Sequence, residues 1–340
     1  MQKLREHSSD PSDSPSAREE GSDGYGRMDI SATQLLDPTA GPEVSVARRD
    51  PPRADVEVRR TRPIALVTGA TDGIGRAVSQ RLAGLVDTLL VHGRRSESLT
   101  TLAATLAPAN PGTSVVPIVA DFGRFADVER LIRRVRTIYG HLDILVNNAA
   151  TVGQYSHTLT EDGHEQAFQV NYLAPAFLTA GLFDLLLVAR RGRIVNVVCD
   201  AYRDVTTFDQ DPLGNRCYHP AVAYAQSKFA LVAHTASLVA ACSGTRLAAV
   251  CVDPGFTETK LQRQSFRWPG GPVSAAADNV LYAVTKPVHD REFYVQGKEI
   301  VQPQSEVLQI PVQRQLDKVT GEALDMSLPW AATGLLRMGA

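Results

Sequence analysis

Short apolar runs alternate with longer amphipathic segments along most of the chain. Runs of four to eight apolar residues ending in Gly, Asp or Asn are typical of buried parallel strands. Strands that alternate with helical segments of ten or more residues indicate βαβ units and a parallel sheet covered on both faces. The pattern therefore predicts one doubly wound α/β domain of about seven strands over residues 62–302. The runs that predict strands are "IALVTGA", "TLLVHG", "SVVPIVAD", "LDILVNNAA", "GRIVNVV", "TRLAAVCVDPG" and "EFYVQGKEIV".

The segments between these runs have helical periodicity. The longest is expected to form a single helix around residues 162–190, and the last predicted strand, 292–301, follows a helix at 273–285. Residues 303–340 are expected to form a helical extension packed beside the domain. The other predicted helices begin in "GIGRAVSQRLAGL", "SESLTTLAATLA", "FADVERLIRRVRTIYG" and "AVAYAQSKFALVAHTASLVAA".

Residues 1–61 differ from everything that follows. They are rich in Ser, Asp, Pro and Gly, as in "EHSSDPSDSPSAREEGSDGYG". Such a segment cannot bury enough apolar area to offset its ordering entropy, so we expect it to be disordered. It has no apolar h-region of a secretory signal, and its acidic residues argue against a transit peptide. It is therefore predicted to be a polar tail outside the domain.

Composition narrows the class of protein further. A net charge of −2 gives no reason to expect a nucleic-acid partner, and the four cysteines lack metal-like spacing. No uninterrupted apolar run reaches roughly 18 residues, so no membrane span is expected. The best candidate, "FLTAGLFDLLLVA", carries Asp184 and is predicted to be a buried helix. We expect reduced cysteines, no bound metal and a cytoplasmic location.

The turn after the first strand carries the first chemical signal. "TGATDGIG" stands between an apolar run and a helical segment. This arrangement places backbone N–H groups and the positive end of a helix dipole against a pyrophosphate, and glycine permits the close approach. The sequence therefore predicts a dinucleotide site that includes Thr68, Gly69, Thr71, Asp72, Gly73, Ile74 and Gly75.

The end of the second strand indicates which dinucleotide is bound. An NAD enzyme places an acid there to bind the ribose 2′-hydroxyl, whereas residues 91–95 read Val-His-Gly-Arg-Arg. An acid would repel a 2′-phosphate, and an arginine offers charge-assisted hydrogen bonds to it. Arg94 or Arg95 therefore favours NADP(H).

Five motifs in order extend the picture beyond this site. The spacing TGxxxGxG, "NNAA" at 147–150, Asn171 in "QVNYLAPAFLT", "YAQSK" at 224–228 and "DPGFTET" at 253–259 resemble the short-chain dehydrogenase/reductase family. The stretch from "CDAYRDVTTF" to "YAQSKFALV" and the C-terminal "RQLDKVTGEAL" are similar to its retinol-dehydrogenase-like branch. The resemblance covers most of residues 62–300 and implies a Rossmann-type fold.

The resemblance also assigns roles to particular positions. Asp121 would meet the adenine, and Thr257 would meet the carboxamide of the nicotinamide. Lys228 would hold the ribose hydroxyls, and Asn171 would steady a water on the proton path. The remaining implied cofactor contacts are Phe122, Asn147, Asn148, Ala149, Tyr224, Pro254 and Gly255.

Tyr224 and Lys228 stand four residues apart on a predicted helix, so they share a face. A phenol with an ordinary pKa near ~10 is a poor acid or base at neutral pH. A neighbouring ammonium and a positive nicotinamide ring are expected to lower the pKa of Tyr224 toward working pH. The resemblance implies that Tyr224 exchanges a proton with the substrate oxygen while hydride moves.

One position departs from the family. The serine that would hydrogen-bond the substrate carbonyl aligns with Cys199 in "GRIVNVVCDA". A thiol is a weaker donor and acceptor, and a lost oxyanion donor costs about 10²–10³ in rate. Three readings stay open. In the first, Cys199 replaces the serine as a weaker hydrogen-bond partner of the substrate carbonyl. In the second, Asp200, Tyr202 or a hydroxyl of the substrate takes the role of the serine. In the third, the protein binds NADP without turnover.

The resulting hypothesis is an NADP(H)-dependent carbonyl reductase or alcohol dehydrogenase. Substrate is expected beneath "FTETKLQRQSFRWPGG", whose apolar residues favour an apolar ketone or alcohol, with a natural-product intermediate as one such class. Rival hypotheses are an NADP sensor and a rearrangement or epimerisation with recycled cofactor. Whether the chain forms a homodimer is left open. The predicted substrate contacts are Asp200, Tyr202, Phe256 and Trp268.

Overall fold

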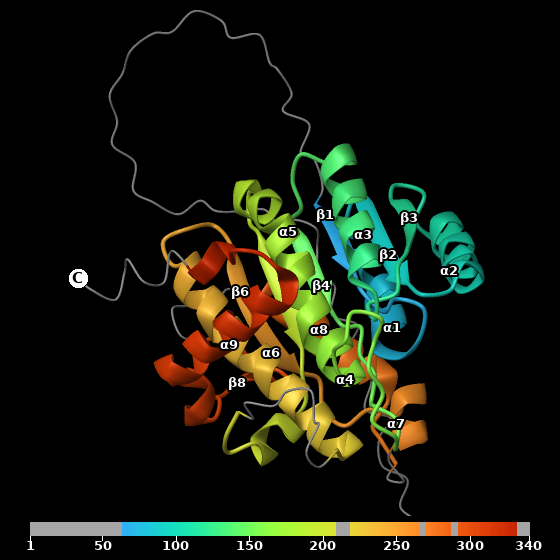
Figure 1. The fold of residues 1–340 in the computed structure, drawn as a ribbon. Coiled ribbons are helices and arrows are strands. Elements are labelled where there is room, and N and C mark those ends of the chain that lie inside the picture. The colour runs from blue at the N-terminus through green and yellow to red at the C-terminus, as the bar shows by residue number, and fades with distance from the viewer. Residues whose placement is uncertain (1–62, 209–217, 266–268, 287–291, 332–340) are drawn as a thin grey trace, which may run out of the picture. The chain divides into compact units, whose positions relative to one another are not determined.

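The computed structural model describes residues 63–208, 218–265, 269–286 and 292–331. The tail predicted to be disordered and Trp268 lie outside these ranges. In the described part, eight strands form one sheet in the order β3-β2-β1-β4-β5-β6-β7-β8 (Figure 1). Strands β1 to β7 pair in parallel, and β8 pairs antiparallel to β7. The strands are β1 (Ile64–Val67), β2 (Thr88–Gly93), β3 (Ser114–Val119), β4 (Ile144–Asn147), β5 (Arg193–Val197), β6 (Ala248–Asp253), β7 (Tyr294–Gln296) and β8 (Glu299–Ile300).

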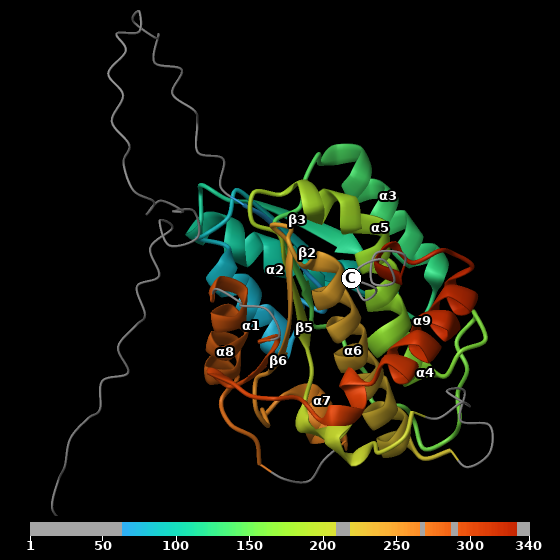
Figure 2. The same cartoon turned by 90° about the vertical axis from the view of Figure 1, so that its left-hand side faces the viewer.

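Helices cover both faces of this sheet, which confirms the predicted α/β class. Figure 2 shows α1 and α8 on one side of the strands and α5, α6 and α9 on the other. The α-helices are α1 (Gly73–Leu82), α2 (Ser96–Ala109), α3 (Phe125–Ile138), α4 (Gln166–Phe168), α5 (Ala174–Val188), α6 (Pro220–Cys242), α7 (Lys260–Ser265), α8 (Val273–Thr285) and α9 (Ile310–Leu324). Shorter turns of other helical types are η2 (Gln169–Leu173, a π-helix), η3 (Asp200–Asp204) and η4 (Ser305–Leu308).

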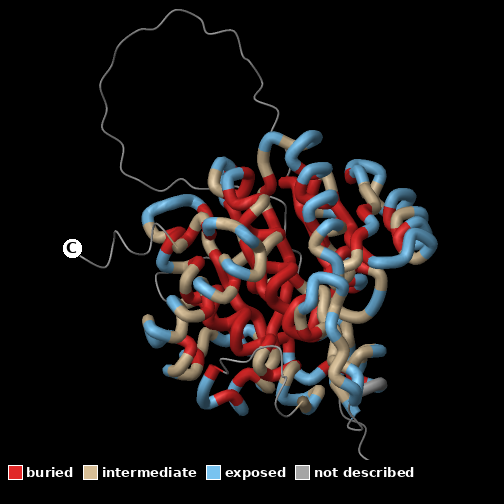
Figure 3. The backbone as a smooth tube through the Cα atoms, in the orientation of Figure 1, coloured by how far each residue is buried: buried red, intermediate tan, exposed pale blue. Residues whose placement is uncertain are grey.

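The core lies between the sheet and its helices. Every residue of β1 and β4 is buried, and buried residues gather in the strands and on the inner sides of the helices (Figure 3). A strand covered on both faces has no polar side, which explains the continuous apolar runs in the sequence. Helix α6 is unusually buried as well, because the sheet lies on one side of it and α9 on the other.

The strand order reverses between β1 and β4. Chain connections run from β1 outward to β3 and then return to β4 on the other side of β1. In doubly wound sheets, the crevice outside the carboxyl ends of the strands at such a point is where ligands bind. The residues that follow β1, β4, β5 and β6 therefore meet at one edge.

Two predicted elements differ from the structure. The strand predicted at 292–301 is a hairpin of β7 and β8, because Gly297 has φ +62° and turns the chain back. The helix predicted from about 162 begins only at Gln166. Gly163 has φ +82°, which a right-handed helix does not allow, and the Glu165 carboxylate caps the helix by accepting from Phe168 N at 2.7 Å.

The stretch Gln166–Val188 is also the one described helix with the length and mean hydropathy of a membrane span. Its most apolar window is 72% buried inside the fold, so the core accounts for its composition. Asp184, within it, is exposed and binds the Arg136 guanidinium. The prediction of a buried helix agrees with this placement, and the structure puts Asp184 on its outer side.

Helix α9 is fastened to the domain by a buried hydroxyl pair. Tyr172, within η2, and Thr320, within α9, share a hydrogen bond between fully buried side chains. Thr320 Oγ1 also donates to Leu316 O at 2.7 Å, so the Tyr172 hydroxyl is the donor of the pair. The C-terminal extension thus contacts the turn that carries Asn171.

Thr320→Val is expected to lower the free energy of unfolding by about 1–3 kcal/mol, since it leaves the buried Tyr172 hydroxyl without its acceptor. Chemical denaturation measures the effect. Thr137→Val is the matched control, because Thr137 makes the same hydrogen bond to a carbonyl four residues earlier but is exposed. Equal losses in the two variants would contradict the assigned role of the pair.

Candidate functional site at the carboxyl edge of the sheet

The glycine-rich turn joins β1 to α1. Gly69 has φ +65°, and a Cβ on Gly75 would lie 2.3 Å from Gly69 O and from Asn148 Nδ2. Asp72 caps α1, its Oδ1 accepting from Gly73 N at 2.7 Å. Only glycine at position 75 therefore lets the start of α1 pack this closely against Gly69 and Asn148, and the first backbone N–H groups of α1 lie at this turn.

Thr68 and Asn148 fasten this turn to the end of β4. Thr68 Oγ1 accepts from Asn148 N at 2.9 Å and from Ala149 N at 3.0 Å, and it donates to Val146 O. Asn148 Nδ2 donates to Thr68 O at 2.9 Å. The predicted cofactor residues 68–69 and 148–149 thus hold one another in place from two neighbouring strands.

Asn147 has a different environment from Asn148. Its side chain is buried, and its Nδ2 donates to Asn196 Oδ1 at 2.8 Å and to Thr179 Oγ1 at 3.3 Å. These partners lie in the core between β4, β5 and α5. The structure gives the Asn147 side chain a place inside the sheet, and only its backbone lies at the edge.

His92, near the end of β2, is a site residue that the sequence reading missed. Its Nδ1 accepts from Gly69 N at 3.3 Å, so its Nε2 carries the proton and donates to Ala120 O at 3.0 Å. The imidazole stacks on Phe122 with centroids 4.2 Å apart. Burial lowers the pKa of His92 to about 4, which keeps this neutral bridge intact at neutral pH. A polar residue near the end of an otherwise apolar strand was the available signal.

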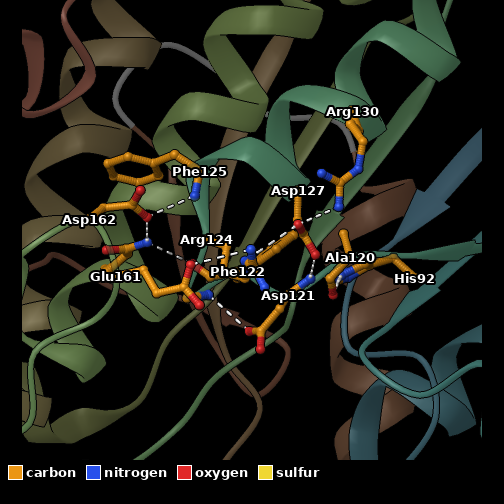
Figure 4. Close-up of polar contacts among 12 residues, drawn as sticks. His92, Ala120, Asp121, Phe122, Arg124, Phe125, Asp127, Arg130, Glu161 and Asp162 are labelled. Atoms are coloured by element: carbon orange, nitrogen blue, oxygen red, sulfur yellow. Dashed lines mark hydrogen bonds and ion pairs between the residues drawn. The ribbon is translucent and has the colours of Figure 1, made fainter.

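The turn after β3 holds Asp121 at the same edge (Figure 4). Asp121 Oδ1 accepts from Gly123 N at 3.0 Å, and its own N–H donates to Asp127 Oδ2 at 3.0 Å. Asp162 Oδ2 accepts from Phe125 N at 2.8 Å at the start of α3. The predicted adenine contact Asp121 is therefore part of a turn fixed by carboxylates.

Arg94 and Arg95 follow β2 and are both exposed. Arg95 precedes α2 as its capping residue, and no acid stands at the end of β2. Arg94 is near enough to His92 to lower the pKa of that imidazole slightly. The two guanidiniums are thus free to reach an anionic group beside the glycine-rich turn.

Cys199 and Tyr224 meet beyond the end of β5. Cys199 Sγ donates to Tyr224 Oη at 3.5 Å, although 25 residues separate them in the chain. Cys199 is partly exposed, while Tyr224 lies on α6 with 8% of its surface exposed. The structure brings together the two residues that the family pattern pairs as serine and tyrosine.

Lys228 lies one turn further along α6. Its Nζ donates to Val197 O at 3.1 Å and lies 5.6 Å from the centre of the Tyr224 ring. Burial lowers the pKa of Lys228, whereas the nearby Cys199, Cys251 and Asp253 side chains raise it. The spacing predicted from the sequence does place both side chains on one face.

Asn171 connects the π-turn η2 to α6. Its Nδ2 donates to Thr151 O at 2.8 Å and to Ser227 Oγ at 2.9 Å, and its Oδ1 accepts from Thr151 N. Ser227 Oγ in turn donates to Tyr224 O at 2.7 Å. Neither Ser227 nor Thr151 was identified from the sequence. Both orient Asn171 relative to the tyrosine.

The electrostatics of Tyr224 differ from the expectation. Burial raises the pKa of Tyr224 well above its ordinary value, and the Cys199 and Asp253 side chains raise it further. The protein groups alone therefore move the pKa of Tyr224 in the direction opposite to the predicted lowering, because desolvation of the phenolate is the largest cause. These groups keep Tyr224 protonated. The contribution of a positive nicotinamide stays a prediction. Burial also raises the pKa of Cys199.

The predicted substrate contacts are placed unevenly. Phe256 is 52% exposed after β6, and Asp200 is exposed at the start of η3. Tyr202 is fully buried, its hydroxyl accepting from Gln304 N at 3.2 Å, so it belongs to the core instead of contacting substrate. Thr257 is 7% exposed, and its Oγ1 donates to Gly255 O at 2.8 Å.

A cleft of about 280 Å³ adjoins the glycine-rich turn. It lies between the start of α1 and the segment after β6, and charged side chains of both signs surround it. Its lining includes Asp72, Arg76, Glu258, Thr259, Lys260 and Arg263. The segment predicted to cover the substrate therefore lies beside the first turn of α1.

Comparison with known proteins agrees with this geometry. The sequence profile described as short chain dehydrogenase matches residues 63–270. The chain belongs to the short-chain dehydrogenase family. Human polyprenol dehydrogenase is 30% identical over 223 residues, which are 64% of this chain and 65%, slightly less than two thirds, of that protein. A Streptomyces sp. (strain C5) protein named as a daunorubicin C-13 ketoreductase is 32% identical over 203 residues, 58% of this chain and 67% of its own length.

Solved structures also resemble the fold. A protein from Escherichia coli CFT073, solved in complex with NADPH, is 26% identical with a TM-score of 0.56. The match covers 70% of this chain and 98% of that one. The named relatives include a retinol dehydrogenase 13, in line with the retinol-dehydrogenase-like branch recognised in the sequence.

Gly75→Ala is expected to weaken NADPH binding by more than about tenfold, because the added Cβ meets the backbone oxygen of Gly69. Quenching of protein fluorescence or enhancement of NADPH fluorescence measures the affinity. Gly140→Ala is the control, since a Cβ there meets nothing within 4 Å. Unchanged affinity in Gly75→Ala would show that the turn does not hold the dinucleotide.

Proposed function

We propose that the protein is an NADP(H)-dependent oxidoreductase that interconverts a ketone or aldehyde with the matching alcohol. The observation that carries this proposal is the meeting of Cys199 Sγ and Tyr224 Oη at 3.5 Å, with Lys228 behind the tyrosine. These groups stand at the sheet edge that the glycine-rich turn also borders. A donor to a carbonyl oxygen thus lies beside a dinucleotide site.

The residues present fit a nicotinamide dinucleotide. The close packing at Gly75, which leaves no room for a Cβ, sets the N–H groups at the start of α1 beside the glycine-rich turn, where they suit a pyrophosphate. Arg94 and Arg95, with no acid at the end of β2, favour a 2′-phosphate. A bound NADP(H) would supply or accept the hydride. The NADPH complex of the Escherichia coli relative supports this choice.

Tyr224 is assigned the role of proton donor to the substrate oxygen. Burial raises its pKa, so it stands ready as a phenol that donates to a carbonyl oxygen. The Asn171–Ser227 contacts fix the first turns of α6, and Lys228 Nζ is held by Val197 O. The side chains of this group therefore need little rearrangement to hold a substrate oxygen.

Cys199 takes the place of a hydroxyl donor. Its thiol, partly exposed and adjacent to Tyr224, acts as a second, weaker donor to the same substrate oxygen. Its raised pKa keeps it in the neutral form that can donate. Asp200 is the alternative for this role, but its carboxylate already accepts hydrogen bonds from Gln296 Nε2 and Arg203 Nε.

The substrate is assigned to a fairly apolar class. Phe256 stands exposed at the edge where substrate would enter. Relatives named for polyprenol, retinol and daunorubicin support a large, mainly apolar carbonyl or alcohol, with a natural-product intermediate as one case. A cytoplasmic location stays a prediction from the cysteines.

Tyr224→Phe is expected to abolish ketone-dependent NADPH oxidation, because it removes the proton donor. Cys199→Ser is expected to raise the rate by about tenfold to a hundredfold, since a hydroxyl is the stronger donor. The fall in NADPH absorbance with a panel of apolar ketones as substrates measures the rates of both variants. NADPH that binds but is never consumed, even by Cys199→Ser, would instead support binding without turnover.

Replacing both Arg94 and Arg95 by Ala is expected to weaken NADPH binding by about tenfold to a hundredfold, because the 2′-phosphate loses its cations. NADH lacks that phosphate and serves as the matched ligand, with affinity expected to stay unchanged. Titration of the variant and the parent protein with each dinucleotide measures the ratio of the NADPH and NADH affinities. A parallel loss for NADH and NADPH would remove the assignment of these arginines.

A further inference from the structure

The start of helix α3 is capped by a residue from a distant part of the sequence. Arg124 occupies the N-cap position of α3, and a guanidinium offers no acceptor to the first N–H groups of the helix. The Asp162 carboxylate takes this role, because its Oδ2 accepts from Phe125 N at 2.8 Å (Figure 4). A negative charge at a helix N-terminus also stabilises the helix. The segment after β4 therefore completes the helix that begins just after the predicted adenine contact Asp121.

A closed loop presents this carboxylate to the helix. Thr160 N donates to His164 O at 2.8 Å, and Gly163 N donates to Thr160 O at 3.0 Å. Gly163 has φ +82°, a conformation that glycine adopts without strain. Asp162 lies within this loop and is itself exposed. Backbone hydrogen bonds of the loop, instead of burial in the core, therefore set its position.

Gln169 connects the loop to the turn after β3. It lies in the π-turn η2, and its side chain is fully buried. Its Nε2 donates to Asp162 Oδ2 at 2.6 Å and to Phe122 O at 3.3 Å. Its Oε1 accepts from Thr160 Oγ1. Loss of the Asp162 carboxylate would leave one donor of this buried amide without its acceptor, which favours a rearrangement around Phe122.

Phe122 extends this contact to the rest of the edge. Its ring stacks on the His92 imidazole with centroids 4.2 Å apart, and His92 Nδ1 accepts from Gly69 N at 3.3 Å. Asp121, one residue earlier in the chain, is held through its Oδ1 by Gly123 N. A shift of Phe122 would therefore move the predicted adenine contact and disturb the packing against the glycine-rich turn.

We propose that Asp162 is a positioning residue for the dinucleotide. Through Gln169 and the start of α3, it holds the turn 121–123 in the form that receives the adenosine end of NADP(H). This inference rests on the proposed function, since it requires a dinucleotide at this edge. The same π-turn η2 carries Asn171, so the element that orients the catalytic tyrosine also fastens the adenosine end of the site.

Asp162→Ala tests the proposal with two ligands. NADPH carries the whole dinucleotide, whereas adenosine 2′,5′-bisphosphate carries only its phosphorylated adenosine end. The variant is expected to bind both ligands about tenfold more weakly than the parent protein, because the loosened turn costs the same free energy in each complex. Isothermal titration calorimetry measures the affinities. Unchanged affinity for adenosine 2′,5′-bisphosphate overturns the proposal.

Asp162→Asn is the conservative variant. Its amide oxygen can still accept from Phe125 N and Gln169 Nε2, so its affinities for both ligands are expected to stay within about twofold of the parent values. A loss as large as that of Asp162→Ala would make the charge responsible and overturn the assigned hydrogen bonds.

Glu161→Ala is the matched control. Glu161 is the neighbouring exposed carboxylate, and it pairs with Arg124 at 3.3 Å in an exposed ion pair that contributes little. Its removal is expected to leave both affinities unchanged. An equal loss in Glu161→Ala and Asp162→Ala would mean that any charge removed from this loop has the same effect, and would overturn the proposal.

Stability and turnover separate positioning from a merely structural role. A merely structural role lowers the melting temperature of Asp162→Ala and leaves its ligand affinities unchanged. If the protein reduces ketones, KM for NADPH is expected to rise about tenfold in Asp162→Ala while kcat stays unchanged, because only binding of the adenosine end is affected. NADPH that binds without turnover refutes the proposed function, while the titrations still decide the role of Asp162. A parent protein that binds neither ligand overturns both.

Discussion

A row of buried, hydrogen-bonded polar side chains runs through the middle of the sheet. It fixes helix α6, which carries Tyr224, against the strands whose ends form the site. Asn147 Nδ2 donates to Asn196 Oδ1, and Asn196 Nδ2 donates to Thr235 Oγ1, both at 2.8 Å. Cys251 Sγ donates to the same Thr235 oxygen at 3.1 Å. The row joins β4, β5 and β6 to α6. A buried polar group that loses its hydrogen-bond partner destabilises the folded protein. Such a network therefore permits only one alignment of the helix and the strands.

This alignment explains how residues far apart in sequence reach one edge. Helix α6 carries Tyr224, β6 ends in Asp253, and Cys199 follows two residues after the end of β5. A slide of α6 along the sheet would separate the phenol from the thiol and break the bond of Lys228 to Val197 O. The buried contacts that align α6 with the sheet therefore also hold the side chains of the site in place.

The sequence pattern predicted the parallel strands and most helices because burial on both faces leaves an unbroken apolar run. It failed where one glycine decides the path: Gly297 turns a predicted strand into a hairpin, and Gly163 delays a helix. Both positions need φ > 0, which hydrophobic periodicity does not register. The motif residues at the strand ends were predictable, since the carboxyl ends of parallel strands meet at one edge.

The remaining site features depend on tertiary burial. Tyr202 was expected at the substrate but is covered by Tyr294 and Gln304, which follow it by about a hundred residues in the chain. The role of His92 requires Gly69 to lie opposite its ring. Contacts of this kind join elements whose register a single sequence does not reveal.

The electrostatics of the site reverse an argument that is sound on an isolated helix. There, an ammonium four residues from a phenol would favour the phenolate. Within the fold, removal of water from around Tyr224 disfavours the anion more strongly, and the carboxylate at the end of β6 acts in the same direction. A protonated phenol beside a neutral thiol offers two donors to one oxygen.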